Sequence, residues 1–244
     1  MRASTIARWW FGLTALTVLL ALVISLVQAI TSDEPEFGSW VADAFNVFAY
    51  FTIQSNIIVG VTSLLMALRV ERRSTPFCVF RLDGVIMMLV TAIVFHSLLA
   101  GLVDERGWAA VADQLVHTAT PILTVLGWLI FGPRGLISGR VIGWSVVYPL
   151  LWVGFTLVRG AITHWYPYPF LDVGELGYPR VTLTILGITV GFVGLAVGLR
   201  WLDGWLTRRA ALGGSLGSVT STDALCTTAD TPPGVADTPP QGGR

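Results

Sequence analysis

A few polar side chains lie inside the most apolar stretches of this sequence. Among them are the hydroxyl of Thr52, the imidazoles of His96 and His117, and the guanidinium of Arg159. An imidazole gains and loses protons near neutral pH, and a hydroxyl donates or accepts a hydrogen bond. Because polar groups are costly in an apolar environment, each of these four side chains needs a partner or a function.

The spacing of these side chains places them on shared faces of predicted helices. At a rise of ~1.5 Å per residue along those helices, Thr52, His96 and His117 lie about 9–12 Å below the outer surface of the membrane. Pro121 follows His117 by four residues, so the carbonyl of His117 loses its helical partner and the helix should kink there. The three polar stripes are Thr52, Ser55 and Asn56; Asp113, His117, Thr120 and Thr124; and Tyr148, Trp152, Thr156 and Arg159.

Each of these residues also has a purely structural interpretation. A threonine in a membrane helix commonly donates a hydrogen bond to its own backbone, and a buried histidine can join two helices. Gln54, Ser55 and Asn56 can hold helices together in the same way, and Arg159 can extend to the membrane surface. The residues by themselves therefore predict a polar pocket in the outer half of a membrane domain, and they name no reaction.

The elements that must position these residues are transmembrane helices. Of the 244 residues, 54% are hydrophobic and only 12% are charged, which leaves too little charge for the surface of a soluble protein of this size. Six apolar runs of about 20 residues are each long enough to cross a ~30 Å hydrocarbon core and too long for strands. We predict an all-α, polytopic bundle of six transmembrane helices over residues 1–205. The runs lie near 9–30, 44–68, 83–103, 111–131, 141–163 and 181–202.

The arginines predict the orientation of this bundle. Only Arg106, Arg159 and Arg180 of the 15 basic residues fall in the segments predicted to lie outside, so both termini are predicted to be cytoplasmic. Residues 206–244 are rich in Gly, Ser, Thr and Pro and repeat Ala-Asp-Thr-Pro-Pro, which predicts a disordered cytoplasmic tail. A net charge of zero gives no indication of a nucleic-acid partner.

No cofactor, metal site or disulfide is predicted. His96, His117 and Asp113 have the side chains of a metal site but lack a diagnostic spacing. Cys78 and Cys226 both fall in segments predicted to face the cytoplasm, where thiols stay reduced.

Three blocks of this chain resemble a known membrane-protein family. Residues 50–56 read Tyr-Phe-Thr-Ile-Gln-Ser-Asn, and residues 117–121 read His-Thr-Ala-Thr-Pro, with Gly-Pro-Arg-Gly at 132–135. Residues 166–172 read Tyr-Pro-Tyr-Pro-Phe-Leu-Asp. In this order the blocks resemble bacterial six-pass membrane proteins that are related to the eukaryotic androgen-induced and androgen-dependent membrane hydrolases. The resemblance covers about residues 40–205.

The resemblance implies an intramembrane hydrolase of lipid esters in a bacterial plasma membrane. The eukaryotic relatives cleave fatty acid esters of hydroxy fatty acids with a threonine and a histidine, which correspond to Thr52 and His117. An imidazole that takes the hydroxyl proton would turn this poor nucleophile into a useful one. Asp172 departs from the eukaryotic block, which ends in Glu. We add candidates for substrate or oxyanion binding (Asn56, His96, Arg159, Gln54 and Ser55) and for orienting the histidine (Asp113 and Asp172).

Two other classes of function use the same residues. A transporter or proton-relay protein would need the buried histidines without covalent chemistry, and a non-catalytic protein would only bind lipid. The predicted inner halves of the helices are mostly apolar, which argues against a route through the membrane. In every case the expected partners are membrane lipids or a lipid-ester substrate, and the sequence does not indicate an oligomeric state.

Overall fold

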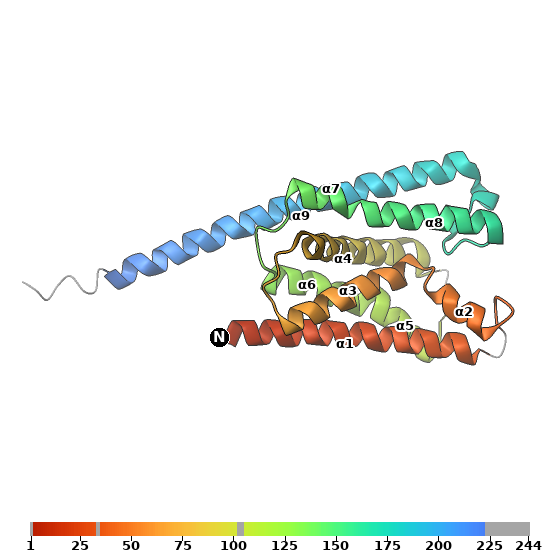
Figure 1. Cartoon of the computed structure of the whole chain (residues 1–244), viewed down its shortest axis with the longest axis horizontal. Coiled ribbons are helices and arrows are strands. Elements are labelled where there is room, and N and C mark those ends of the chain that lie inside the picture. Colours follow the sequence, from red (N-terminus) through yellow and green to blue (C-terminus); the bar gives the residue numbers. More distant parts are fainter. Residues whose placement is uncertain (1, 33–34, 102–104, 223–244) are drawn as a thin grey trace, which may run out of the picture. The chain divides into compact units, whose positions relative to one another are not determined.

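The computed structural model describes residues 2–32, 35–101 and 105–222, and over these residues all regular structure is helical. Six of its helical segments are long and apolar enough to cross a membrane, as predicted, and the protein is an all-α, multi-pass membrane protein (Figure 1). The segments are Ser4–Thr31, Phe51–Leu68, Thr75–Leu99, Trp108–Phe131, Gly139–Thr163 and Val173–Arg209.

The helices within these segments are interrupted at defined places. The α-helices are α1 (Arg2–Thr31), α2 (Trp40–Val47), α3 (Phe51–Leu68), α4 (Thr75–Val94), α5 (Trp108–Gln114), α6 (Thr120–Phe131), α7 (Gly139–Ser145), α8 (Val147–Thr163) and α9 (Val173–Thr222). Two π-helical turns, η1 (Phe95–Leu99) and η2 (Leu115–Ala119), continue α4 and α5, and η3 (Pro169–Leu171) is a short 3-10 turn.

The predicted second span, 44–68, is divided into two helices. Ser39 caps α2 by accepting a hydrogen bond from the Ala42 amide, and the chain turns before α3 begins with Tyr50 in an extended conformation. The turn leaves backbone carbonyls without helical partners, and side chains satisfy two of them. Gln54 Nε2 donates to the Phe48 carbonyl at 2.7 Å, and Trp152 Nε1 donates to the Ala49 carbonyl at 3.0 Å.

Other boundaries also differ from the prediction. The third span begins at Thr75 instead of 83, because Pro76 fits the first turn of a helix and α4 continues through Arg81 and Asp83. The sixth begins at Val173 instead of 181. Its helix α9 continues to Thr222, so residues 206–222 are helical where a disordered tail was predicted. The rest of the predicted tail, with Cys226, lies outside the described residues.

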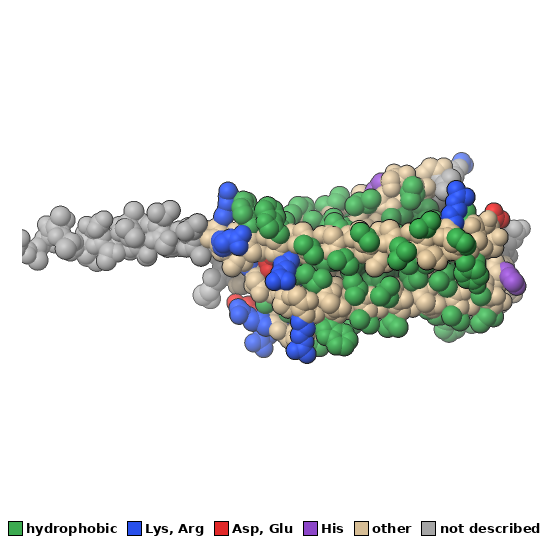
Figure 2. Space-filling model, turned by 90° about the horizontal axis from the view of Figure 1, so that it is seen from above, with side chains coloured by type: hydrophobic (Ala, Val, Ile, Leu, Met, Phe, Trp, Pro, Cys, Tyr) green, Lys and Arg blue, Asp and Glu red, His purple; other side chains and the backbone are tan. Residues whose placement is uncertain are grey.

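The bundle is built around α4, which is the most buried spanning helix. Its Ile86, Met87 and Met88 are fully buried, and α3 and α6 pack against it. The outward faces of the other helices carry large apolar side chains, as a lipid environment requires. Figure 2 shows this apolar surface, with most of the visible basic side chains gathered at the end of the bundle where α1 begins.

Candidate functional site

Thr52 lies in the first turn of α3, directly after the break at residues 48–50. Amides in the first turn of a helix have no intrahelical acceptor. The Thr52 amide instead donates to the hydroxyl of Tyr168 at 3.3 Å, and the same hydroxyl lies 3.2 Å from Thr52 Oγ1. The Thr52 side chain is buried, so its hydroxyl faces the protein interior and not lipid.

His117 meets Thr52 from another helix. Its Nε2 lies 3.4 Å from Thr52 Oγ1, and its Nδ1 lies 2.8 Å from Asp113 Oδ1. A proton on Nδ1 is then donated to Asp113, which leaves the lone pair of Nε2 facing the threonine hydroxyl. The Phe95 ring stacks on the imidazole with centroids 3.9 Å apart and planes inclined by 7°. Thr52, His117 and Asp113 thus form a continuous chain of polar contacts.

The backbone around His117 explains how α5 and α6 present it. His117 lies in the π-helical turn η2, and Pro121 follows in the first turn of α6. Proline cannot donate a hydrogen bond to the carbonyl four residues earlier, so a wider turn at this position relieves the conflict. The kink predicted from Pro121 therefore takes the form of a π-helical turn.

Tyr168 completes the group and is the residue that the sequence analysis missed. Burial raises the pKa of its phenol, while hydrogen bonds from Thr52 lower it in part. The phenol therefore stays protonated at neutral pH and can donate a hydrogen bond. Tyr168 stands within the block at 166–172, but nothing in that pattern indicated that its hydroxyl would reach Thr52, 116 residues away.

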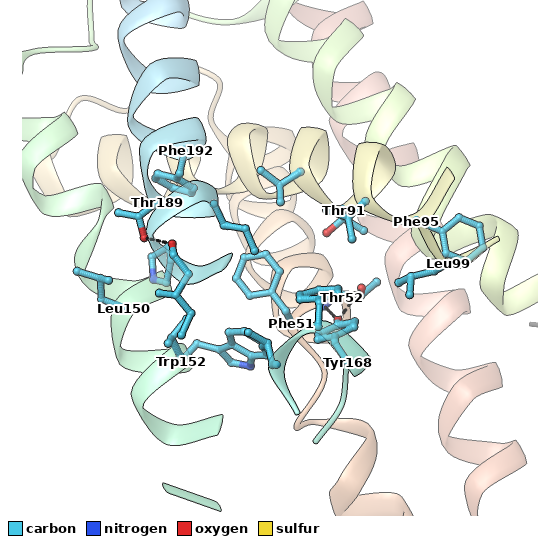
Figure 3. Close-up of a pocket in the computed structure, with 18 of the residues that line it drawn as sticks. Phe51, Thr52, Thr91, Phe95, Leu99, Leu150, Trp152, Tyr168, Thr189 and Phe192 are labelled. Carbon is cyan, nitrogen blue, oxygen red and sulfur yellow. Dashed lines mark hydrogen bonds between the residues drawn. The ribbon is translucent and has the colours of Figure 1, made fainter. Parts of the chain in front are cut away.

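A largely apolar pocket opens beside Thr52 and His117 (Figure 3). Its unoccupied space, counted out through the open mouth, is about 850 Å³. Phe51 and Trp152 line it near Thr52, while Leu150 and Phe192 line it farther away. Its walls come from α4, α8 and α9, and its polar side chains are Thr52, Thr91, His117, Tyr168 and Thr189.

A second, more polar cavity lies on the other side of Phe95. Phe95 lines both cavities, and Asp113 lines the second one together with His96, Glu105 and Gln114. Phe95 therefore contributes to both an apolar and a polar space, and the imidazole stacked on it lines only the apolar one. The carboxylate that contacts His117 faces the polar side.

Three polar residues that follow Thr52 on α3 form hydrogen bonds of their own. Asn56 Nδ2 donates to the carbonyl of Thr52 at 2.8 Å and to that of Val116 at 3.4 Å, which joins α3 to η2. Ser55 donates to the Phe51 carbonyl, and Gln54 accepts a hydrogen bond from Tyr148 at 2.5 Å. None of the three lines the pocket at Thr52.

The expectation that His96 and Arg159 line the same cavity as Thr52 is wrong. His96 is exposed, lies 3.2 Å from Thr118 Oγ1 and lines the polar cavity. Arg159 donates to Asn46 at 2.6 Å and lies over the Trp165 ring at 4.6 Å. A shared depth does not decide which face of a helix a residue occupies, and here the faces differ.

Asp172 is also separate from His117. Its Oδ1 accepts from the amides of Gly174 at 2.8 Å and Glu175 at 3.2 Å, so it caps the start of α9. Of the two aspartates proposed to orient His117, only Asp113 contacts the imidazole. Across residues 2–32, 35–101 and 105–222, no three His, Cys, Asp or Glu side chains gather into a possible metal site.

Comparisons with protein-family models, with curated proteins and with solved structures found no match.

Proposed function

We propose that this protein hydrolyses lipid esters within the membrane, with Thr52 as the nucleophile, His117 as the general base and Asp113 as the residue that orients the base. The observation that carries the proposal is the chain of contacts from Thr52 Oγ1 to His117 to Asp113 at one end of a largely apolar pocket. The resemblance of the sequence blocks to bacterial six-pass relatives of lipid-ester hydrolases supports the same reaction and a location in a bacterial plasma membrane.

The first half of the proposed reaction transfers the acyl group to Thr52. As Thr52 Oγ1 attacks the ester carbonyl carbon, its proton passes to His117 Nε2. The tetrahedral intermediate then collapses, the bond to the alcohol oxygen breaks, and His117 returns the proton to that oxygen. The alcohol leaves, and Thr52 carries the acyl group as an ester.

The second half releases the acid and restores the enzyme. His117 Nε2 takes a proton from water, and the resulting hydroxide attacks the acyl carbon. When the bond to Thr52 Oγ1 breaks, His117 returns the proton to that oxygen and the fatty acid leaves.

Tyr168 replaces the oxyanion donors proposed from the sequence. Its neutral phenol lies 3.2 Å from Thr52 Oγ1, next to the place where the carbonyl oxygen would gain negative charge. Asn56, His96 and Arg159 do not line this pocket. We therefore assign the stabilisation of the oxyanion to the Tyr168 hydroxyl.

One observation favours the alternative function, a transporter or proton-relay protein. Asp113, His117, Thr52 and Tyr168 are in successive contact, as a proton relay requires. However, this relay ends in a pocket with mostly apolar walls, where a transferred proton has no further acceptor among the lining residues except threonine hydroxyls. Hydrolysis of a lipid ester accounts for both the relay and the apolar pocket.

The proposal is tested with the full-length protein in detergent and a panel of long-chain esters, including esters of hydroxy fatty acids. We expect wild type to cleave an ester and Thr52→Ala to lose that activity while remaining monodisperse on size exclusion. Thr189→Ala is the matched control, because Thr189 lines the same pocket and donates only to the Ile185 carbonyl. Similar rates for wild type and Thr52→Ala would overturn the mechanism, and binding without cleavage would favour a lipid-binding protein.

A further inference from the structure

Asp83 is a buried carboxylate that the proposed reaction does not use. It lies in the third turn of α4 and is fully buried. Neither of its carboxylate oxygens has a hydrogen-bond partner among the described residues. A buried carboxyl group without hydrogen-bond partners is unfavourable, so this position suits a ligand that provides donors or positive charge.

Asp83 lies at the base of a groove between α4 and the α7–α8 segment. Phe80 and Thr75 line the groove from α4, while Arg140, Trp144 and Tyr148 line it from the other side. Phe80 and Trp144 are 43% and 54% exposed, so their rings are open to a ligand from the lipid. The groove therefore combines one carboxylate with aromatic walls, which is a suitable environment for an organic ammonium group.

The groove is separate from the site at Thr52. Gly84, the neighbour of Asp83, packs beside Val59 of α3, and Val59 follows Thr52 by seven residues. This spacing corresponds to about 10 Å along the helix. The residues that line the groove and those that line the Thr52 pocket do not overlap.

Asp83 lies inside the third span, on the side nearer to its first residue. The span begins at Thr75, so Asp83 lies about 12 Å farther along the helix. Arg140, the second residue of α7, is exposed on the same groove and offers a guanidinium to a phosphate.

We propose that this groove binds an amine-bearing phospholipid, whose ammonium group pairs with Asp83 and whose phosphate is held by Arg140. A metal ion is a poorer fit, because Asp83 is the only acidic side chain among the residues that line the groove. An anionic lipid without an amine would satisfy Arg140 but leave Asp83 unpaired. The ligand class is thus set by two opposite charges on one groove.

The test titrates the full-length protein in detergent with short-chain phosphatidylethanolamine and measures binding by the shift in melting temperature. Phosphatidylglycerol of the same chain length lacks the amine, dodecylamine lacks the phosphate, and dodecanol lacks both. We expect wild type to prefer phosphatidylethanolamine over phosphatidylglycerol. Asp83→Asn should weaken binding of phosphatidylethanolamine and dodecylamine by about tenfold or more, because a charged hydrogen bond is lost.

Two further variants separate the parts of the proposal. Arg140→Gln should weaken the binding of phosphatidylethanolamine and leave the binding of dodecylamine unchanged. Glu175 is an exposed carboxylate elsewhere, so Glu175→Gln should change the binding of neither ligand. Without ligand, Asp83→Asn should be at least as stable as wild type, because Asp83 has no hydrogen bond to lose within the described residues. Equal binding by wild type and Asp83→Asn would overturn the proposal. Binding of dodecylamine without a preference for phosphatidylethanolamine would replace the lipid by a free amphiphilic amine and also overturn it.

Discussion

The Thr52 hydroxyl has one proton and two polar neighbours, His117 Nε2 and the Tyr168 hydroxyl. The Tyr168 oxygen already accepts from the Thr52 amide, so its own proton is available to Thr52 Oγ1 or to a substrate oxygen. The threonine proton is then directed to His117, whose Nδ1 proton is directed to Asp113. Each donor has an acceptor, and the Thr52 proton points to the imidazole that would accept it in general base catalysis.

This network predicts that Thr52 and His117 act as one unit. Thr52→Ala and His117→Ala should each reduce ester cleavage by about 10³-fold or more, and the double variant should lose little beyond either single variant. Thr52→Ser should retain some activity, because it keeps the hydroxyl. The rate of cleavage of a long-chain ester is measured for all four variants. Single effects that multiply in the double variant would show that the residues act independently. A polar contact that only bridges two helices contributes ~0.6 kcal/mol, so its loss should reduce activity only modestly.

Tyr168→Phe tests the oxyanion assignment. Removal of the phenol hydroxyl should lower kcat by about 10²-fold, as loss of an oxyanion donor does, with a much smaller change in KM. Because burial raises the pKa of Tyr168 above the ordinary value near 10, this contribution should persist to at least that pH in wild type. An unchanged kcat in Tyr168→Phe would leave Tyr168 as a packing residue only.

At the scale of elements, hydrophobic length was enough to predict six spanning helices. The pairing of Thr52 with His117 came from sequence blocks, and that of Asp113 with His117 from their four-residue spacing on one helix. The break at residues 48–50 was not predictable, because the residues there are apolar and carry no Pro or Gly. The partner that stabilises it, Trp152, lies more than 100 residues away. Likewise, the packing of the helices decides which way His96 and Arg159 face, and depth along a helix does not predict that packing.

The packing of α1 on α3 provides a prediction of its own. A Cβ added to Gly60 would lie 2.9 Å from Val18 Cγ1, whose side chain is itself buried. Gly60→Ala should therefore destabilise the bundle by ~1–3 kcal/mol, as overpacking does. Gly154→Ala is the control, because a Cβ there meets no atom of the described chain within 4 Å. Reversible unfolding in mixed micelles measures both, and equal stability of the two variants would contradict the close packing.

At the scale of the whole molecule, the described residues divide into two units, and the site lies within the first, which ends at Gly204. Every residue that contributes to the pocket at Thr52 belongs to the first unit. The orientation of the bundle remains a prediction from the arginines. We expect a cysteine introduced at residues 70–73 to react with a membrane-impermeant thiol reagent only from the cytoplasmic side.

Deletion of residues 211–244 should leave both folding and activity nearly intact. The deleted segment has few large apolar side chains, and the described residues that line the pocket lie between Phe51 and Phe192. Melting temperature and ester cleavage of the shortened protein provide the measurement. A large loss of detergent-stable protein would show that the segment packs against the bundle.

Covalent labelling tests the nucleophile most directly. Full-length wild type, Thr52→Ala and Thr189→Ala are treated with a long-chain fluorophosphonate, and the adduct is located by mass spectrometry of proteolytic peptides. We predict that wild type and Thr189→Ala carry one adduct on Thr52, that Thr52→Ala carries none, and that His117→Ala labels far more slowly. An adduct on another residue of wild type, or undiminished labelling of Thr52→Ala, would contradict the assignment of Thr52 as the nucleophile.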